Sequence, residues 1–176
     1  MKKILFFTAA FASIIIVGQA QISRTQIGVA ADIGLPTGGF DNDFNTGYGG
    51  SLKGLWRAGK SGQVTFTTGY TYYESKGELS NYHGSSGIIP FLAGYRLIKG
   101  GLYAEPQIGY GLYRLTIKDY GGTRLSETDG AFTYAIGVGF ATHGIDIGLR
   151  YQGAKKGSDD ITVIVIHVGY IISFKK

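Results

Sequence analysis

The chain has 176 residues, including 30 glycines, 13 tyrosines and 10 phenylalanines but no cysteine and only 3 prolines. This composition favours twisted β-structure over a helical bundle, and the lack of cysteine excludes disulfides and thiolate metal sites. The formal charge of +5 falls to +3 without Lys2 and Lys3, which is too small and too dispersed for a nucleic-acid-binding protein. No linker divides the remaining chain, so we expect a single domain.

The first twenty residues predict an export signal. Two lysines precede the apolar run 4–17, and Gly18 and Ala20 place small residues at the two positions that a signal peptidase reads. The run is shorter than the roughly 20 residues that a helix needs to cross a bilayer, which argues against a membrane anchor. We therefore interpret 1–20 as a cleaved signal peptide and 21–176 as the mature domain.

The mature sequence alternates between apolar and polar residues with a period of two, as strands with two different faces do. Eight segments carry this pattern: 26–33, 48–57, 63–72, 90–97, 102–112, 132–141, 145–152 and 163–174. In the last segment Ile164, Ile166 and Val168 share a wholly apolar face, whereas His167 and Gly169 lie on the other. Central strands of a parallel sheet would be apolar on both faces, so the pattern predicts an antiparallel sheet.

The apolar face carries most of the side-chain bulk. Its branched and aromatic residues would overfill the interior of an eight-stranded barrel, whereas the opposite face of Gly, Ala, Ser, Thr and a few charges fits inside one. We therefore predict an all-β, eight-stranded antiparallel up-and-down transmembrane β-barrel, with Ile164, Ile166 and Phe132 directed outward into lipid. A secreted, lipocalin-like carrier is an alternative, and its interior would have to be the apolar face.

The connections between the segments alternate in length. Those at 59–61, 99–100 and 143–144 are short, and those at 36–46, 74–86, 116–129 and 154–160 are long. Membrane barrels have short periplasmic turns and longer outer loops, so we expect periplasmic termini and four longer, mobile outward loops. The two-residue turns predict that Ala141 pairs with Asp146 and that Leu97 pairs with Leu102.

Aromatic residues near the segment ends predict two girdles at the membrane interfaces. One consists of Trp56, Tyr95 and Phe140, and the other of Tyr48, Tyr72, Tyr110 and Tyr151.

Charged residues occur on the face predicted to line the lumen. They are Asp32, Lys53, Arg57, Arg96, Glu105, Asp146 and Arg150, with His167 beside them. Buried charges need partners, so we interpret them as an ion-pair network that fills the barrel, with Arg96 and Glu105 as diagonal neighbours. A proton path or narrow pore is the alternative interpretation of the same residues.

The end of the last segment carries a further signal. His167, Gly169, Ile172 and Phe174 form a polar-x-Gly-x-x-apolar-x-apolar pattern, which resembles the signal that the barrel-assembly machinery recognises. Over its whole mature length the chain resembles the small eight-stranded outer-membrane β-barrel family of Gram-negative bacteria. The resemblance implies an outer-membrane monomer that contacts lipid and lipopolysaccharide and meets the assembly machinery during insertion. We expect no nucleic-acid partner, cofactor or metal.

These observations favour a non-enzymatic barrel that serves envelope structure or surface interaction, and they do not identify a loop ligand. The alternative is a lipid A or phospholipid hydrolase that uses His83 and Ser85 at the outer rim, in a spacing that loosely resembles the His-x-Ser of lipid A deacylases. Nucleophilic catalysis also needs a carboxylate to orient the imidazole, and Glu74 or Glu78 could supply it.

Overall fold

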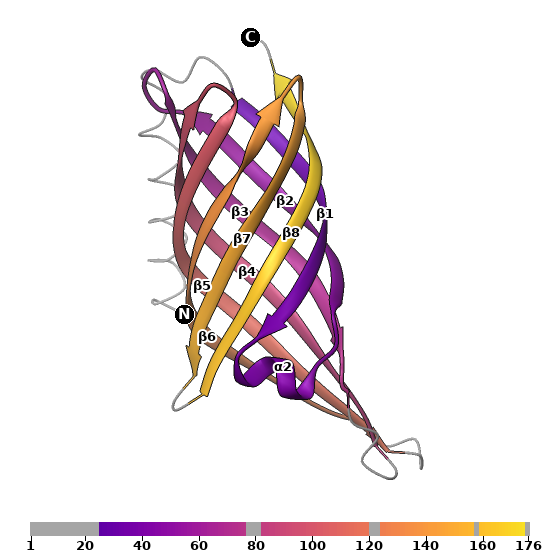
Figure 1. The fold of residues 1–176 in the computed structure, drawn as a ribbon. Coiled ribbons are helices and arrows are strands. Elements are labelled where there is room, and N and C mark those ends of the chain that lie inside the picture. Colours follow the sequence, from indigo (N-terminus) through magenta and orange to yellow (C-terminus); the bar gives the residue numbers. More distant parts are fainter. Residues whose placement is uncertain (1–24, 77–81, 120–123, 157–158, 175–176) are drawn as a thin grey trace, which may run out of the picture.

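The structure, a computed structural model, describes residues 25–76, 82–119, 124–156 and 159–174. Its strands are β1 (Thr25–Thr37), β2 (Gly47–Arg57), β3 (Gly62–Glu74), β4 (Tyr82–Lys99), β5 (Leu102–Asp119), β6 (Arg124–Thr142), β7 (Ile145–Lys156) and β8 (Asp159–Phe174). Each strand pairs antiparallel with the next, and β1 also pairs with β8, which closes the barrel (Figure 1). The predicted fold is therefore confirmed, whereas the predicted signal peptide lies outside the described residues.

Tight turns join the strands at the end where β1 begins and β8 ends, which we call the terminal end. They comprise residues 58–61, 100–101 and 143–144. Both residues of each two-residue turn have a positive φ, 61° and 88° at Gly100 and Gly101 and 49° and 89° at His143 and Gly144. Type I′ hairpins require this backbone, whose twist matches that of the flanking strands.

The turns fix the register of the strands that they join. Ala141 pairs with Asp146, which confirms the prediction for this hairpin. Leu97 pairs with Ala104, so its predicted pairing with Leu102 is wrong. The turn falls on the two glycines at 100–101, one residue later than predicted, because the second glycine also adopts a positive φ without steric cost.

At the opposite end, β4, β5 and β6 continue well past the rest of the barrel (Figure 1). We call this the extension end. The predicted loop 116–129 is wrong in length, because β5 runs to Asp119 and β6 starts at Arg124, and the predicted loop 154–160 is likewise mostly strand. The predicted loop 36–46 contains a short helix, α2 (Gly39–Asp43). No helix in the described ranges is long and apolar enough to cross a membrane.

Large apolar side chains point outward along all eight strands. Phe132 is 58% exposed, whereas its neighbours Ala131 and Thr133 are 5% and 0% exposed. Ile164 and Ile166 alternate with Val163 and Val165, which are turned inward and buried. The apolar exterior is therefore confirmed, and the interior described below does not suit a carrier of apolar ligands.

The barrel mouth at the extension end is filled with apolar side chains. Phe44, beside α2, packs in one buried cluster with Tyr73, Ile88 and Tyr113. The ring of Phe40 lies 4.6 Å from that of Phe44 and 5.3 Å from that of Tyr73. The interior thus has an apolar layer beneath α2 in addition to the predicted small and charged residues.

Candidate functional site

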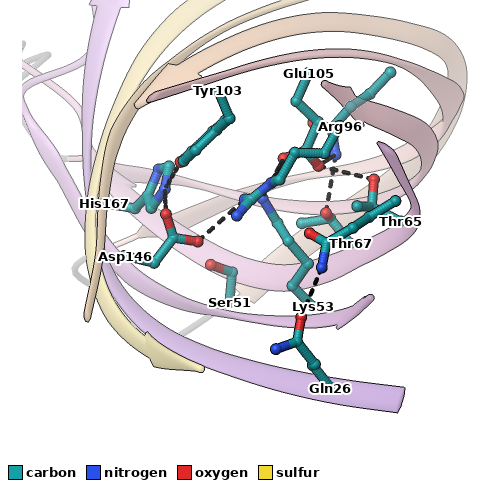
Figure 2. Close-up of polar contacts among 12 residues, drawn as sticks. Gln26, Ser51, Lys53, Thr65, Thr67, Arg96, Tyr103, Glu105, Asp146 and His167 are labelled. Carbon is teal, nitrogen blue, oxygen red and sulfur yellow. Dashed lines mark hydrogen bonds and ion pairs between the residues drawn. The ribbon is translucent and has the colours of Figure 1, made fainter. Parts of the chain in front are cut away.

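Glu105 stands at the centre of the polar part of the lumen. Its Oε2 accepts hydrogen bonds from Lys53 Nζ at 3.0 Å and Arg96 Nε at 2.7 Å, and both pairs are ion pairs. Its Oε1 accepts from Thr65 Oγ1 and Gln107 Nε2, each at 2.8 Å. Four donors from β2, β3, β4 and β5 therefore satisfy a carboxylate that is 1% exposed (Figure 2).

A second carboxylate connects this group to the far wall of the barrel. Arg96 Nη2 donates to Asp146 Oδ2 at 3.1 Å, and the guanidinium carbon lies 3.7 Å from the centre of the Tyr103 ring. His167 Nε2 lies 2.9 Å from the Tyr103 hydroxyl and 3.7 Å from Asp146 Oδ1. Arg96 thus bridges two acids and stacks on an aromatic ring without contact with solvent (Figure 2).

The other residues predicted for the lumen differ in their positions. Asp32 is buried and accepts a hydrogen bond from Ser51 Oγ at 3.0 Å. Arg150 is also buried, but no partner of its Nε is found within the described part of the chain. Arg57 does not join the network, because β2 ends at this residue and leaves its side chain exposed at the terminal end.

The network closes the lumen. A cavity of about 20 Å³ lies between Lys53, Asp146, Arg150 and His167, which is room for about one water molecule. A passage for solutes needs a continuous opening, and this interior holds close ion pairs in its place. No group of three potential metal-binding side chains occurs among the described residues.

The extension end presents a sheet with two different faces. Leu115, Ile117 and Leu125 stand on the face that continues the lumen wall and are 43%, 40% and 69% exposed. Arg114 and Thr116 stand on the opposite face, which continues the outer wall of the barrel. On the extension the apolar residues therefore lie on the inward face and the polar residues on the outward face, the reverse of the barrel wall. This is expected for a sheet that has left the lipid.

One edge of the extension has no neighbouring strand. β6 pairs with β5 from Lys118↔Arg124 onward, but its pairing with β7 begins only at Thr133↔Ala154. Within the described ranges, residues 124–128 therefore offer backbone groups without a strand partner on the side that faces away from β5. An exposed row of N–H and C=O groups is a template for an additional strand. Sequence reasoning missed this edge because it read the segment as a loop.

The residues of the hydrolase hypothesis lie on the strands at this end. Ser85 is half-buried and pairs directly with Glu74 across β3 and β4. His83 occupies the next position of the same parity along β4, opposite Lys118. The imidazole of His83 and the whole of Glu78 lie outside the described part of the structure.

The aromatic residues predicted as girdles lie on the outer wall. Tyr48, Tyr72, Tyr95, Tyr110, Phe140 and Tyr151 are exposed and Trp56 is half-buried. The residues predicted as an assembly signal end β8: Ile172 and Phe174 face outward and His167 faces the lumen. Gly169 lies against β1, where a Cβ atom would stand 2.4 Å from the Val29 carbonyl oxygen.

A closed antiparallel barrel with an apolar exterior and a filled, charged interior defines a transmembrane β-barrel of the outer-membrane type. Residues 6–171 match the family model described as outer membrane protein beta-barrel domain, and the chain belongs to this family. Membership of this family places the protein in the outer membrane.

Solved structures share the fold at low sequence identity. Ail of Yersinia pestis, in complex with the heparin analogue sucrose octasulfate, is 15% identical with a TM-score of 0.66, and the match covers 86% of this chain and 100% of that chain. Neisserial surface protein A is 17% identical with a TM-score of 0.52, over 86% of this chain and 97% of that one. No curated protein sequence matches. These likenesses show the fold alone.

Proposed function

We propose that this protein is a non-enzymatic outer-membrane barrel whose termini and short turns face the periplasm and whose extension end contacts partners outside the cell. The tight turns lie at the same end as the start of β1 and the end of β8, and β4, β5 and β6 extend at the other end. This arrangement supports the orientation, since membrane barrels keep their short turns on the periplasmic side. The filled lumen supports a role in surface interaction over one in transport.

The free edge of β6 at residues 124–128 carries the proposal. An extended peptide adds to such an edge through main-chain hydrogen bonds, and pockets for alternate side chains provide specificity. Leu115, Ile117 and Leu125 lie exposed on one face next to that edge. The partner that fits is an extended segment of another polypeptide with apolar side chains at every second position.

Proline substitution along the edge tests this proposal. A library of displayed random peptides is selected on the wild-type protein in detergent, and the selected peptides are then measured against Glu127→Pro and Thr128→Pro. Successive N–H groups of a strand point to opposite sides, so one of the two variants removes a donor from the free edge. We expect selected peptides to alternate in polarity and to lose binding to that variant. Equal binding to both variants and to the wild type refutes the edge as the binding site.

Lipid and lipopolysaccharide remain proposed contacts of the outer wall. Arg114 is exposed on the outward face of the extension, one same-face rung beyond Leu112. Cationic positions just above an apolar band suit the phosphates of lipid A. We expect Arg114→Gln to lower retention on lipopolysaccharide-coated beads, and an unchanged retention would argue against this contact.

Lipid hydrolysis is a second candidate, because Glu74 pairs with Ser85 and His83 follows on the same strand. It predicts that expression of the protein changes the acyl composition of lipid A or phospholipid and that Ser85→Ala abolishes the change while folding persists. The non-enzymatic proposal predicts the same lipid profile with and without expression. Mass spectrometry of envelope lipids therefore separates the two.

A further inference from the structure

A recess of about 240 Å³ opens at the terminal end of the barrel. Its lining includes Gln26, Arg57, Lys60, Ser61, Gln63 and Ile98. These residues come from β1, β2, the following turn, β3 and β4, so the recess is the mouth of the lumen at this end. The central ion pairs of Arg96 and Glu105 do not contribute to its lining.

The inner side of the recess carries a chain of neutral hydrogen bonds. Gln63 Nε2 donates to Gln26 Oε1 at 2.7 Å, and Gln26 Nε2 donates to Ser173 Oγ at 2.7 Å. These bonds hold three strands together across the mouth and use one donor of each amide. Among the described residues no protein group donates a hydrogen bond to Gln63 Oε1, which therefore remains an acceptor at the recess.

The charges of the recess are all positive. Arg57 makes one long hydrogen bond, from Nη2 to the Lys60 carbonyl oxygen at 3.5 Å, and no carboxylate within the described ranges pairs with either cation. The described acids occupy the lumen network or the extension end, as Asp146 and Asp41 illustrate. In the sequence, Arg24 directly precedes β1 and two lysines directly follow β8. Among the described residues, the terminal end therefore lacks the counter-charges that the cations of the lumen network have.

We propose that this recess binds a carboxylate of an acidic peptide or glycopeptide in the periplasm. The planar fork of Arg57 matches a carboxylate in two parallel hydrogen bonds, and Lys60 adds a second cation beside it. Gln63 Oε1 accepts from an N–H group, which the peptide groups next to the carboxylate supply. The volume accommodates a carboxylate with adjoining peptide groups. The periplasmic source of the ligand rests on the orientation proposed above, whereas the chemistry of the recess does not.

Fluorescence polarisation on the full-length protein in nanodiscs tests the site. The probe is a dye-labelled acetyl-Ala-Glu-Ala-Ala peptide, and inorganic phosphate serves as competitor. We expect Arg57→Gln and Lys60→Gln each to weaken binding about tenfold, as loss of a charged hydrogen bond does. Lys99→Gln, at the same end but outside the lining, should change it less than about twofold, because the charge contributes only through screened solvent. Gln63→Leu, which removes the acceptor Oε1, should also weaken peptide binding relative to the wild type.

Two outcomes overturn the proposal. Absence of binding, or binding that Arg57→Gln leaves unchanged, removes the recess as a site. Displacement of the peptide by phosphate at equal concentration shows a general anion site and refutes the choice of carboxylate.

A separate measurement tests which side of the membrane the recess faces. In intact cells the Ser61→Cys variant should not be labelled by a membrane-impermeant maleimide. Labelling in intact cells together with peptide binding in nanodiscs refutes the periplasmic orientation and leaves the site itself standing.

Discussion

Replacement of Glu105 by glutamine is an isosteric change at the centre of the ion-pair network. Glu105→Gln keeps the shape of the side chain but removes its charge and turns one acceptor oxygen into a donor. Lys53 then loses the carboxylate 3.0 Å away, and Arg96 keeps only Asp146. The new amide group also faces other donors, whichever way it is turned.

The expected loss follows from the burial of these partners. Removing one member of a buried ion pair costs about 3–5 kcal/mol, because the remaining charge is left without compensation. Lys53 is 12% exposed in its side chain and borders the polar cavity, so part of its charge stays hydrated. We therefore expect a loss near the lower limit, about 3 kcal/mol. The exposed pair of Asp41 and Lys76 provides a control, and Lys76→Ala should cost less than about 1 kcal/mol.

Urea unfolding in lipid vesicles measures the loss in free energy of unfolding, with heat-modifiable migration in gels as the readout of the folded fraction. The midpoint should shift while the slope stays constant, since the exposed area on unfolding is the same. The double variant Lys53→Met/Glu105→Gln should lose less than the sum of the single variants, because no lysine is then stranded. A Glu105→Gln protein within about 1 kcal/mol of the wild type, or strictly additive losses, would refute the ion-pair account.

Five other substitutions, two matched pairs and one single change, have defined outcomes in the same assay. Gly169→Ala puts a methyl group 2.4 Å from a backbone oxygen of β1, so it should lower the free energy of unfolding by about 1–3 kcal/mol and slow assembly. Gly28→Ala meets no atom closer than 3.6 Å and should leave stability and assembly unchanged. Ile136→Arg on the outer wall should cost about 2–4 kcal/mol, and Leu125→Arg on the extension less than about 0.5 kcal/mol. Tyr103→Phe, which loses the contact with the buried imidazole, should cost about 1–2 kcal/mol. Equal effects within either matched pair would contradict the assigned environments.

Alternation alone was enough to predict the strands and the outward direction of the apolar residues, because a strand between lipid and a filled lumen must differ on its two faces. The sequence also predicted that Arg96 and Glu105 are neighbours, and they form an ion pair, but the pairings across the lumen could not be predicted in the same way. Arg96 meets Asp146, 50 positions later, and Lys53 meets Glu105, 52 positions later. Such contacts cross the lumen and depend on the tilt and stagger of a closed barrel, which local sequence does not encode. Arg57 shares the parity of the lumen residues yet lies at the end of its strand, in water.

The extension was missed although its signal is present in the sequence. Leu112 faces outward next to Ile89 and Gly130, and one rung further Arg114 takes the outward position between Gly87 and Thr128. Between these two rungs the outward positions of β4 and β5 change from apolar to small or polar, and β6 is already small at Gly130. Leu115 places the apolar residue on the opposite face. A strand whose apolar residues move from the outward to the inward face, while the period of two continues, has passed from the membrane into water. The outward face then contacts water in place of hydrocarbon. A search for such inverted alternation would have separated strand extensions from loops in this chain.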